Sequence, residues 1–325
     1  MQRPRVAILL GPTGVGKTGV ALKLAPRLGA QIINADSLQV YREVDIGTAK
    51  PTPAEQALVP HHLLDVVPPD EPYDAARYCR EGRAVLSRLH REGISPLVVG
   101  GTGFYIKALL HGLFADGVAT RSPRERLRLE LDALGLEPLF ARLGSLDPAT
   151  AQRLHPHDAY RILRALEVIE ASGSPLSRLQ AAHRFQDSPF LTLKLGLFLP
   201  REELYQHIDL RVEAMLARGW LTEVRNLLGR YPSEVKPLKA LGYRHLIAFL
   251  EGRWSWEETL EYLKRDTRRY AKRQLTWFRA DPQVRWFHPA QVAEMGELLE
   301  DFFFDKPIRE AGRSGNTAAE YGEPE

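Results

Sequence analysis

Short apolar runs alternate with amphipathic stretches along the first third of the chain, and this alternation predicts a parallel α/β sheet. The runs at 6–10, 31–36 and 97–99 are typical of buried strands, and 61–67 predicts a further strand. Residues 75–91 instead carry apolar positions at helical spacing. Because parallel sheets bind ligands beyond the carboxyl ends of their strands, we expect the functional site at that edge.

The pattern changes near residue 115. Between 115 and 189 apolar residues recur at helical spacing and strand patterns disappear, whereas 191–199 again has the character of a sheet strand. This order predicts a small all-helical domain, 115–189, inserted into an α/β core formed by 1–114 and 190–304.

The C-terminal part is predicted to be mainly helical. Residues 201–230 have the spacing of one amphipathic helix, and helical patterns continue to about residue 304. Residues 305–325 are polar and rich in glycine, which predicts a disordered tail.

Composition narrows the class of protein. The chain has 325 residues, of which 44% are hydrophobic and 26% charged, as is ordinary for a globular protein. Cys79 is the only cysteine, which excludes intramolecular disulfides and cysteine-rich zinc sites. No apolar stretch approaches the ~20 residues of a membrane span, and the first run is too short for a signal peptide. We therefore expect a soluble, cytoplasmic protein.

A glycine-rich motif follows the first predicted strand. Its residues are Gly11, Pro12, Thr13, Gly14, Val15, Gly16, Lys17 and Thr18. The strand before it and the helical pattern after it are the context that G-x-x-x-x-G-K-[ST] requires. The glycines let backbone N–H groups converge on an anion, Lys17 supplies a positive charge, and the Thr18 hydroxyl can bind Mg²⁺. The motif predicts a P-loop NTPase-like sheet, flanked by helices, that binds a di- or triphosphate.

Asp36 stands where the second predicted strand ends. A carboxylate near a phosphate site can act as a base or a metal ligand, although an aspartate there can also cap the next helix. The strand 97–99 ends in Gly100, Gly101 and Thr102 and lacks the Asp with which nucleotide hydrolases hold Mg²⁺. The loop is therefore expected to bind pyrophosphate as a leaving group.

Positive charge is concentrated near the C-terminus, although the net charge is only +3. Between Tyr262 and Arg285 eight Lys and Arg residues outnumber two Asp. Adjacent basic pairs recur every four residues within 264–273 and cover one broad face of a helix, with Asp266 as the neutralising group in the run. Further clusters in the predicted helical domain are Arg121, Arg124, Arg126 and Arg128, and Arg161 with Arg164. These surfaces favour a nucleic-acid stem, and a solvated helix face is the alternative.

Taken in order, these motifs resemble those of the bacterial tRNA dimethylallyltransferases over residues 5–280. The matching segments are GPTGVGKT (11–18), ADSLQVY (35–41), DIGTAKP (45–51), HHLLD (61–65), VVGGTGFY (98–105), LHPHDAYRILRALEV (154–168), KALGYR (239–244) and YAKRQLTWFR (270–279). Tyr160 departs from the Gln that the family often has, and 116–123 is a weak match.

The resemblance implies a prenyl transfer to tRNA. A dimethylallyl group would pass from its diphosphate to the exocyclic amine of the adenine immediately 3′ of the anticodon. Lys17, Thr18 and Mg²⁺ would stabilise the departing pyrophosphate, which Arg211 would also reach. Asp36 would be the general base for the adenine amine, and the enzyme is expected to be a monomer.

The resemblance also implies which residues contact the tRNA anticodon stem-loop. They are Asp36, Ser37, Leu38, Gln39, Thr102, Arg126, Tyr160, Arg161, Ile162, Leu163, Arg164, Lys239, Ala240, Leu241, Gly242, Tyr243, Arg244, Lys272, Arg273, Gln274, Leu275, Thr276, Trp277, Phe278 and Arg279. Anticodon-loop bases are reached by splaying them out of the stack, which suits a deep cleft lined by aromatic and basic side chains.

Other functions share part of this pattern. A small-molecule kinase would have the same phosphate loop and sheet but would not need the basic helix or a second basic domain. An isopentenyltransferase that acts on free adenine nucleotides would share the chemistry but would not need the helical insertion. A non-enzymatic RNA-binding protein would be expected to have lost Lys17 or Asp36, and both are present.

Overall fold

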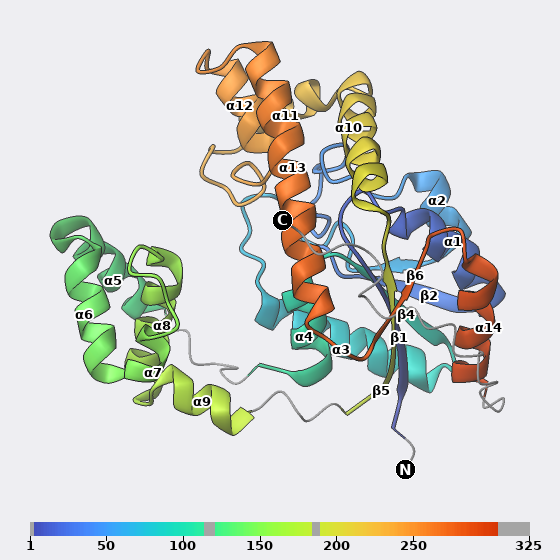
Figure 1. Cartoon of the computed structure of the whole chain (residues 1–325), viewed down its shortest axis with the longest axis horizontal. Helices are drawn as coiled ribbons and strands as arrows, with labels where there is room; N and C mark the ends of the chain where they lie inside the picture. Colours follow the sequence, from blue (N-terminus) through green and yellow to red (C-terminus); the bar gives the residue numbers. More distant parts are fainter. Residues whose placement is uncertain (1–2, 114–120, 184–188, 305–325) are drawn as a thin grey trace. The chain divides into compact units, whose positions relative to one another are not determined.

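The computed structural model of this chain describes residues 3–113, 121–183 and 189–304. The chain divides into two compact units, which are residues 1–109 with 189–325, and residues 110–188 (Figure 1). The tail 305–325, predicted to be disordered, lies outside the described residues, as does most of the weakly matching segment 116–123.

A six-stranded parallel sheet forms the centre of the first unit. Its strands lie in the order β3-β2-β4-β1-β5-β6, and every neighbouring pair runs parallel (Figure 1). They are β1 (Arg5–Leu10), β2 (Ala30–Asn34), β3 (His61–His62), β4 (Ser95–Gly100), β5 (Leu191–Leu197) and β6 (Val284–Phe287). The predicted parallel α/β sheet is confirmed, and the phosphate motif follows a strand inside it.

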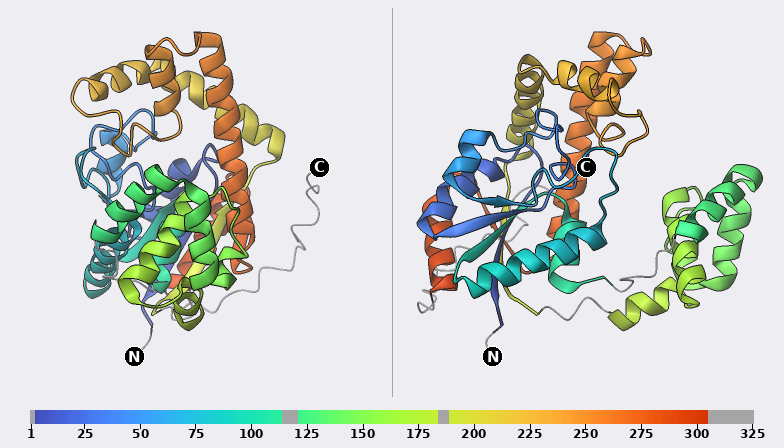
Figure 2. Two further views of the ribbon diagram at one scale, coloured as in Figure 1. Left: turned by 90° about the vertical axis from the view of Figure 1, so that its left-hand side faces the viewer. Right: turned by 180° about the vertical axis from the view of Figure 1, so that it is seen from behind.

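Some helices of the first unit pack on the faces of the sheet, and others pack mainly on one another. They are α1 (Lys17–Arg27), α2 (Pro53–Leu58), α3 (Ala75–Arg91), α4 (Gly103–His111), α10 (Arg201–Ala217), α11 (Trp220–Leu228), α12 (Tyr243–Leu250), α13 (Trp256–Arg279) and α14 (Val292–Phe303). The helix α1 connects β1 to β2, and α3 connects β3 to β4. In the strand order, the step from β1 to β2 goes toward the β3 edge of the sheet, and the step from β3 to β4 goes away from it. Because such crossovers are right-handed, α1 and α3 lie on opposite faces (Figure 2). In the described part of the chain, no helix has both the length and the apolar character needed to cross a membrane.

The core between the sheet, α1 and α14 is built from alternate strand residues. Leu9, Leu97 and Leu195 are fully buried in three adjacent strands and belong to one apolar cluster. Leu24 of α1 and Leu299 of α14 are part of the same cluster. Each such leucine contributes roughly 1.5–3 kcal/mol through burial, so the core fixes the helix that begins at the phosphate motif.

The second unit is helical throughout its described residues. Its helices are α5 (Arg121–Leu134), α6 (Leu136–Leu146), α7 (Pro148–Ala151), α8 (Ala159–Ser172) and α9 (Leu176–His183). They enclose an apolar core of their own, which includes Leu127, Leu139, Leu143, Ile162 and Leu166. The inserted helices expected from the sequence are present, and their role in binding tRNA stays a prediction.

The expectation of one helix over 201–230 is wrong. The chain forms α10 and α11 instead, separated by Gly219 at a φ of 97°. This left-handed conformation suits glycine and ends a helix, because the next residue cannot continue the helical path. A glycine at position 219 could have predicted this helix end, but apolar residues keep helical spacing on both sides of it, and that spacing led to the prediction of one helix.

The structure differs from the predicted strands at two places. The strand β6 was missed, because it is short and lies within a basic segment that was expected to be helical. It pairs with β5, and a Cβ on Gly196 would lie 2.6 Å from the side chain of Val284, so the pairing is close. The strand expected over 61–67 contains only His61 and His62.

Glu223 of α11 holds the loop that follows β2. Its carboxylate accepts four hydrogen bonds, from the backbone N–H groups of Asp45 (3.0 Å), Ile46 (2.6 Å) and Gly47 (3.0 Å) and from the hydroxyl of Tyr243 (2.6 Å). Since charged acceptors make strong hydrogen bonds, this one side chain joins the loop to the C-terminal helices.

Replacing Glu223 with Ala should therefore destabilise the protein by about 1–3 kcal/mol, because three backbone N–H groups lose their acceptor. Urea unfolding followed by circular dichroism measures the change. Glu261→Ala is the matched control, since Glu261 is exposed on α13, and it should change the free energy of unfolding by less than about 0.5 kcal/mol. Equal unfolding free energies for the two variants would contradict the role given to Glu223.

Candidate active site

The phosphate motif forms the turn between β1 and α1, and its backbone requires glycine. Gly14 and Gly16 have φ values of 83° and 93°, and a Cβ on Gly14 would lie 2.8 Å from the side chain of Ile208. The helix α1 begins at Lys17, and Gly16 before it offers no side chain to cap the first turn. The N–H groups of that turn are therefore open to an anion, as at other phosphate-binding helix starts.

The ammonium group of Lys17 lies against its own loop and near two charged side chains. It donates to the carbonyl oxygens of Gly11 at 2.9 Å and Pro12 at 2.8 Å. The pKa of Lys17 is lowered to about 7, chiefly by burial and also by the positive charge of Arg211, while the negative charge of Asp36 opposes both effects. A nearby anion would favour the charged form, so the proton on Lys17 is tied to the ligand in this loop.

Asp36 follows β2, and one of its carboxylate oxygens is fixed by the turn that it begins. Oδ1 accepts from the N–H groups of Leu38 at 2.8 Å and Gln39 at 3.3 Å. No helix follows directly, so Asp36 caps a turn. The alternative that it caps the next helix is therefore wrong. Within the described residues Oδ2 has no hydrogen-bond partner, which leaves it available to a ligand.

The ends of β2 and β4 are tied together beside Asp36. The N–H of Thr102 donates to the carbonyl of Ala35 at 3.1 Å, and the N–H of Ser37 donates to the Thr102 hydroxyl at 3.1 Å. A Cβ on Gly100 would lie 2.2 Å from the carbonyl oxygen of Ala35, so this close approach of the two strand ends requires glycine. The structure thus brings Asp36 and Thr102 together, as expected for the ends of adjacent parallel strands.

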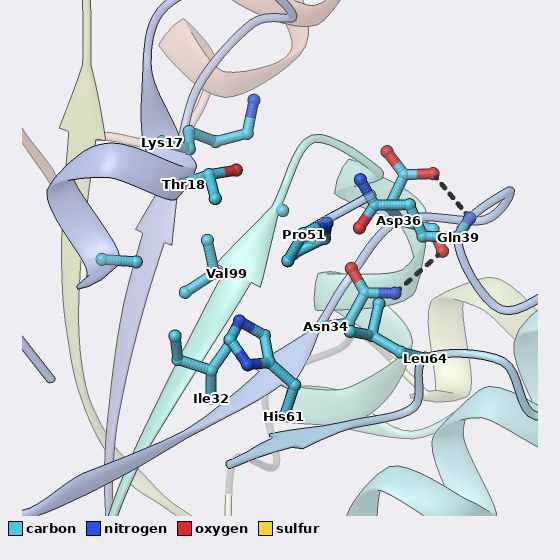
Figure 3. A pocket seen from close by; sticks show the side chains of 12 residues that line it. Lys17, Thr18, Ile32, Asn34, Asp36, Gln39, Pro51, His61, Leu64 and Val99 are labelled. Atoms are coloured by element: carbon cyan, nitrogen blue, oxygen red, sulfur yellow. Dashed lines mark hydrogen bonds between the residues drawn. The ribbon is translucent and has the colours of Figure 1, made fainter. Parts of the chain in front are cut away.

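One pocket joins the phosphate motif to Asp36 (Figure 3). Lys17 and Thr18 enter it from α1, and Asp36 enters it from the opposite side (Figure 3). The remaining lining is mixed and consists of Ala21, Ile32, Asn34, Gln39, Pro51, His61, Leu64, Val99 and Gly100. A pocket with charged groups at its ends and aliphatic side chains between them suits a ligand that is both anionic and apolar.

Several titratable side chains respond to the charge of Asp36. Burial lowers the pKa of Arg211 and Lys236, and it raises the pKa of Tyr105 and Tyr270. In all four side chains the negative charge of Asp36 raises the pKa and so favours the protonated form. Lys236, Tyr105 and Tyr270 are not among the site residues predicted from the sequence. Both tyrosines stand inside motifs that were identified, whereas Lys236 lies outside every motif.

Comparison with known proteins gives this site a family. The family model described as IPP transferase matches residues 39–281, and a model described as isopentenyl transferase matches residues 4–64. The chain belongs to the IPP transferase family. The resemblance stated from the motifs is therefore confirmed.

Relatives within this family are similar along most of the chain. A tRNA dimethylallyltransferase of Syntrophobacter fumaroxidans is 55% identical over 88% of this chain and 84% of its own length. A tRNA dimethylallyltransferase of Desulfosudis oleivorans is 53% identical over 91% of this chain and 95% of its own length. A solved tRNA isopentenylpyrophosphate transferase of Bacillus halodurans is 34% identical, with a TM-score of 0.70 over 93% of this chain and 97% of its own. A eukaryotic dimethylallyltransferase, captured acting on tRNA, is 28% identical with a TM-score of 0.84 over 94% and 81%.

The residues expected to contact tRNA differ in exposure. Those on the surface are Arg126, Tyr160, Arg161, Lys239, Arg244, Lys272, Arg273, Thr276, Trp277 and Arg279. Those partly buried are Asp36, Ser37, Leu38, Gln39, Thr102, Leu163, Arg164, Ala240, Leu241 and Leu275. Those buried are Ile162, Gly242, Tyr243, Gln274 and Phe278. Contact of these residues with tRNA stays a prediction, and the five buried residues offer little surface to a partner in this structure.

The first half of the basic helix α13 is neutralised by its neighbours. Lys264 pairs with Glu213 at 2.6 Å and Arg268 with Asp209 at 2.8 Å, and both carboxylates belong to α10. Asp266 is the neutralising group within the run itself, and packing of α10 against α13 supplies further carboxylates that the local sequence does not contain.

The second half of α13 keeps its positive charge. Lys272, Arg273 and Arg279 are exposed, and they have no carboxylate partner within the part of the chain that the structure describes. Trp277, half exposed at 50%, stands among them. Free cations beside an exposed aromatic ring are suited to phosphate groups and unstacked bases.

Several cations of the helical unit are paired with carboxylates of the same unit. The pairs are Arg126–Glu170 (2.7 Å), Arg161–Asp158 (3.1 Å) and Arg164–Glu167 (2.9 Å). Such exposed pairs are weak, typically below about 1 kcal/mol, so a phosphate can compete for the guanidinium groups. The side chain of Arg121 lies outside the described residues.

Thr18 is the residue expected to bind a metal. The described residues contain no group of three or more His, Cys, Asp or Glu side chains that could hold a metal ion. Mg²⁺, however, is commonly bound by one or two protein oxygens together with substrate phosphates and waters. The Thr18 hydroxyl in the pocket fits that arrangement, in which the diphosphate supplies most of the ligands.

Replacing Lys17 with Met should remove a pH-dependent part of anion binding. With a pKa of about 7, Lys17 contributes fully to pyrophosphate affinity below that pH and progressively less above it. Calorimetric titration of inorganic pyrophosphate into wild type and Lys17→Met across this range isolates the effect, because the ligand's own titration is common to both. A difference in affinity that stays constant with pH would contradict the lowered pKa.

Proposed function

We propose that this chain transfers a dimethylallyl group from dimethylallyl diphosphate to N6 of the adenine immediately 3′ of the anticodon in tRNA and releases pyrophosphate. The observation that carries the proposal is the pocket in which Lys17 and Thr18 lie across from Asp36. Its two ends match the two chemical demands of the reaction, which are stabilisation of a leaving diphosphate and acceptance of a proton.

The diphosphate end is served by the phosphate motif, residues 11–18, and by Arg211. As the carbon–oxygen bond to the diphosphate breaks, negative charge grows on the leaving group, and Lys17, Arg211 and the first N–H groups of α1 stabilise it. Mg²⁺ bound by Thr18 would add positive charge at the same place. Burial makes these cations effective, because a low local dielectric strengthens their attraction to the diphosphate.

The adenine end is served by Asp36. As the adenine nitrogen bonds to the dimethylallyl carbon, its proton passes to the carboxylate, so charge and atoms balance. The turn N–H groups that hold Oδ1 support a fixed orientation with Oδ2 toward the substrate. Thr102, which is joined to Ser37 beside Asp36, is in position to contact the same base.

The tRNA would be bound by the exposed cations of both units. Lys272, Arg273 and Arg279 offer unpaired charge in the first unit, and Arg126 and Arg161 offer exchangeable pairs in the helical unit. The exposed cations and Trp277 on α13 are suited to an anticodon stem-loop, whose target base would leave the stack to reach the pocket.

We also infer a monomeric, cytoplasmic enzyme. One chain carries the complete set of Lys17, Asp36 and Arg211, so a second copy is not needed for the chemistry. The sole cysteine of the sequence, Cys79, is buried, and its thiol donates to the carbonyl oxygen of Ala108 at 3.0 Å; a single cysteine fits a reducing compartment.

Incubation of the purified protein with dimethylallyl diphosphate, Mg²⁺ and unmodified tRNA tests the proposal. Mass spectrometry of the digested nucleosides should detect dimethylallylated adenosine, and sequencing of tRNA fragments should locate it 3′ of the anticodon. A parallel reaction with AMP in place of tRNA distinguishes the free-nucleotide alternative, for which AMP would be the better acceptor. Phosphate transfer from ATP to the acceptor would instead indicate a kinase.

Asp36→Asn should lower turnover by about 10²-fold or more, because the amide keeps the shape of the side chain but cannot accept the proton. Single-turnover kinetics with saturating substrates measures the chemical step, and the affinity for each substrate should change little. Turnover close to wild type would rule out Asp36 as the general base.

Reversal of Lys272 and Arg273 to Glu should weaken tRNA binding strongly. Each change removes a phosphate contact, so the slope of log affinity against log salt should become shallower by roughly one unit per lost contact. Filter binding over a salt series gives both quantities. The matched control is the double reversal of Lys264 and Arg268, whose charges are already paired with α10 and which should change the salt slope less. An unchanged slope for the first variant would identify this part of α13 as a solvated face.

A further inference from the structure

We propose that Gln274 is a positioning residue that couples tRNA binding on α13 to diphosphate binding in the phosphate loop. The inference rests on the function proposed above and extends it. It concerns a side chain that was expected to contact tRNA and instead lies beneath the surface, with 8% of its area exposed.

The side chain of Gln274 joins α13 to both glycine turns of the site. Its Oε1 accepts from the N–H of Thr13 at 2.9 Å, inside the phosphate motif. Its Nε2 donates to the carbonyl oxygen of Gly101 at 2.8 Å, in the turn after β4. One amide group therefore bridges Thr13 and Gly101, which are 88 residues apart in sequence and lie close in sequence to pocket residues such as Lys17 and Gly100.

The fit around this bridge is close. A Cβ on Gly101 would lie 2.5 Å from Nε2 of Gln274, and a Cβ on Gly103 would lie 2.2 Å from the indole nitrogen of Trp277, one turn further along α13. The helix therefore rests directly on the turn after β4. A small shift of α13 would be transmitted to that turn and to Thr13, because close-packed contacts of this kind do not stretch.

The residues next to Gln274 in sequence point the other way. Lys272 and Arg273 are exposed and have no carboxylate partner among the described residues, so they are available to RNA phosphates. Three consecutive positions, 272–274, thus connect a phosphate-binding surface to the backbone of the phosphate loop. When RNA holds this part of α13, the loop conformation that Gln274 supports is favoured as well.

Two binding sites joined in this way have reciprocal affinities. If RNA tightens the binding of diphosphate, diphosphate must tighten the binding of RNA by the same factor. We expect a factor of about five or more, the lower end of typical couplings between distinct sites. Loss of the bridge should reduce the factor toward one while each ligand still binds.

The experiment measures the dissociation constant of inorganic pyrophosphate, in the presence of Mg²⁺, with and without a saturating anticodon stem-loop RNA. The variants are Gln274→Leu, which removes both hydrogen bonds at similar volume, and Gln274→Glu, which keeps an acceptor for Thr13 but cannot donate to Gly101. The constant measured without RNA, divided by the constant measured with RNA, should be about five or more in wild type. This ratio should be near one in Gln274→Leu and intermediate in Gln274→Glu. Thr267→Val is the matched control, because the Thr267 hydroxyl bonds only within α13, to the carbonyl of Leu263, and its ratio should equal that of wild type.

The outcomes separate this inference from the proposed function. A ratio near one in wild type, or a ratio in Gln274→Leu equal to that of wild type, overturns the coupling. Thermal unfolding of each variant shows that it is folded at the temperature of the titration, and a loss of coupling in folded Gln274→Glu supports the inference even if Gln274→Leu unfolds. Because the titrations use non-reacting ligands, they hold whether or not the protein prenylates tRNA, which the nucleoside assay decides independently.

Discussion

The close approach of the chain at the ends of the neighbouring strands β2 and β4 is the constraint on which the rest of the site depends. The backbone after β4 approaches Ala35 so closely that Gly100 has no room for a Cβ, whose position would be 2.2 Å from a carbonyl oxygen. This contact brings the turn that bears Asp36 against the turn that bears Thr102. The phosphate motif after β1 faces both turns across one pocket, so three strand ends supply one site.

Charge in the pocket is organised around a single carboxylate. Burial lowers the pKa of both Lys17 and Arg211, the charge of Arg211 adds to the effect at Lys17, and Asp36 raises the pKa of both. Such an arrangement has an excess of positive charge, which an anionic ligand would neutralise. The same feature explains why a prenyl transferase can use a phosphate loop without the acidic partner of nucleotide hydrolases, since the diphosphate has to leave and not to be cleaved.

The helix α13 serves two purposes along its length. Its first half is fixed by ion pairs with Glu213 and Asp209 of α10, and its second half presents free cations on one side and rests on the glycine turns on the other. An exposed basic surface therefore lies on the same helix that hydrogen-bonds to the phosphate motif through Gln274.

Local pattern in the sequence was enough to predict the parallel sheet, the phosphate motif, the inserted helices and the family. Each of these depends on residues close together in the chain, such as a strand, a glycine loop and a helix in succession. Tertiary structure alone decided which basic residues of α13 are free, because the neutralising carboxylates lie on α10. It also decided that β6 joins the sheet and that Glu223 holds the loop after β2, since the partners in each contact are far apart in sequence. Gln274 belongs with these, because an amide in a basic run gives no sign of being buried until the helix is packed against both loops.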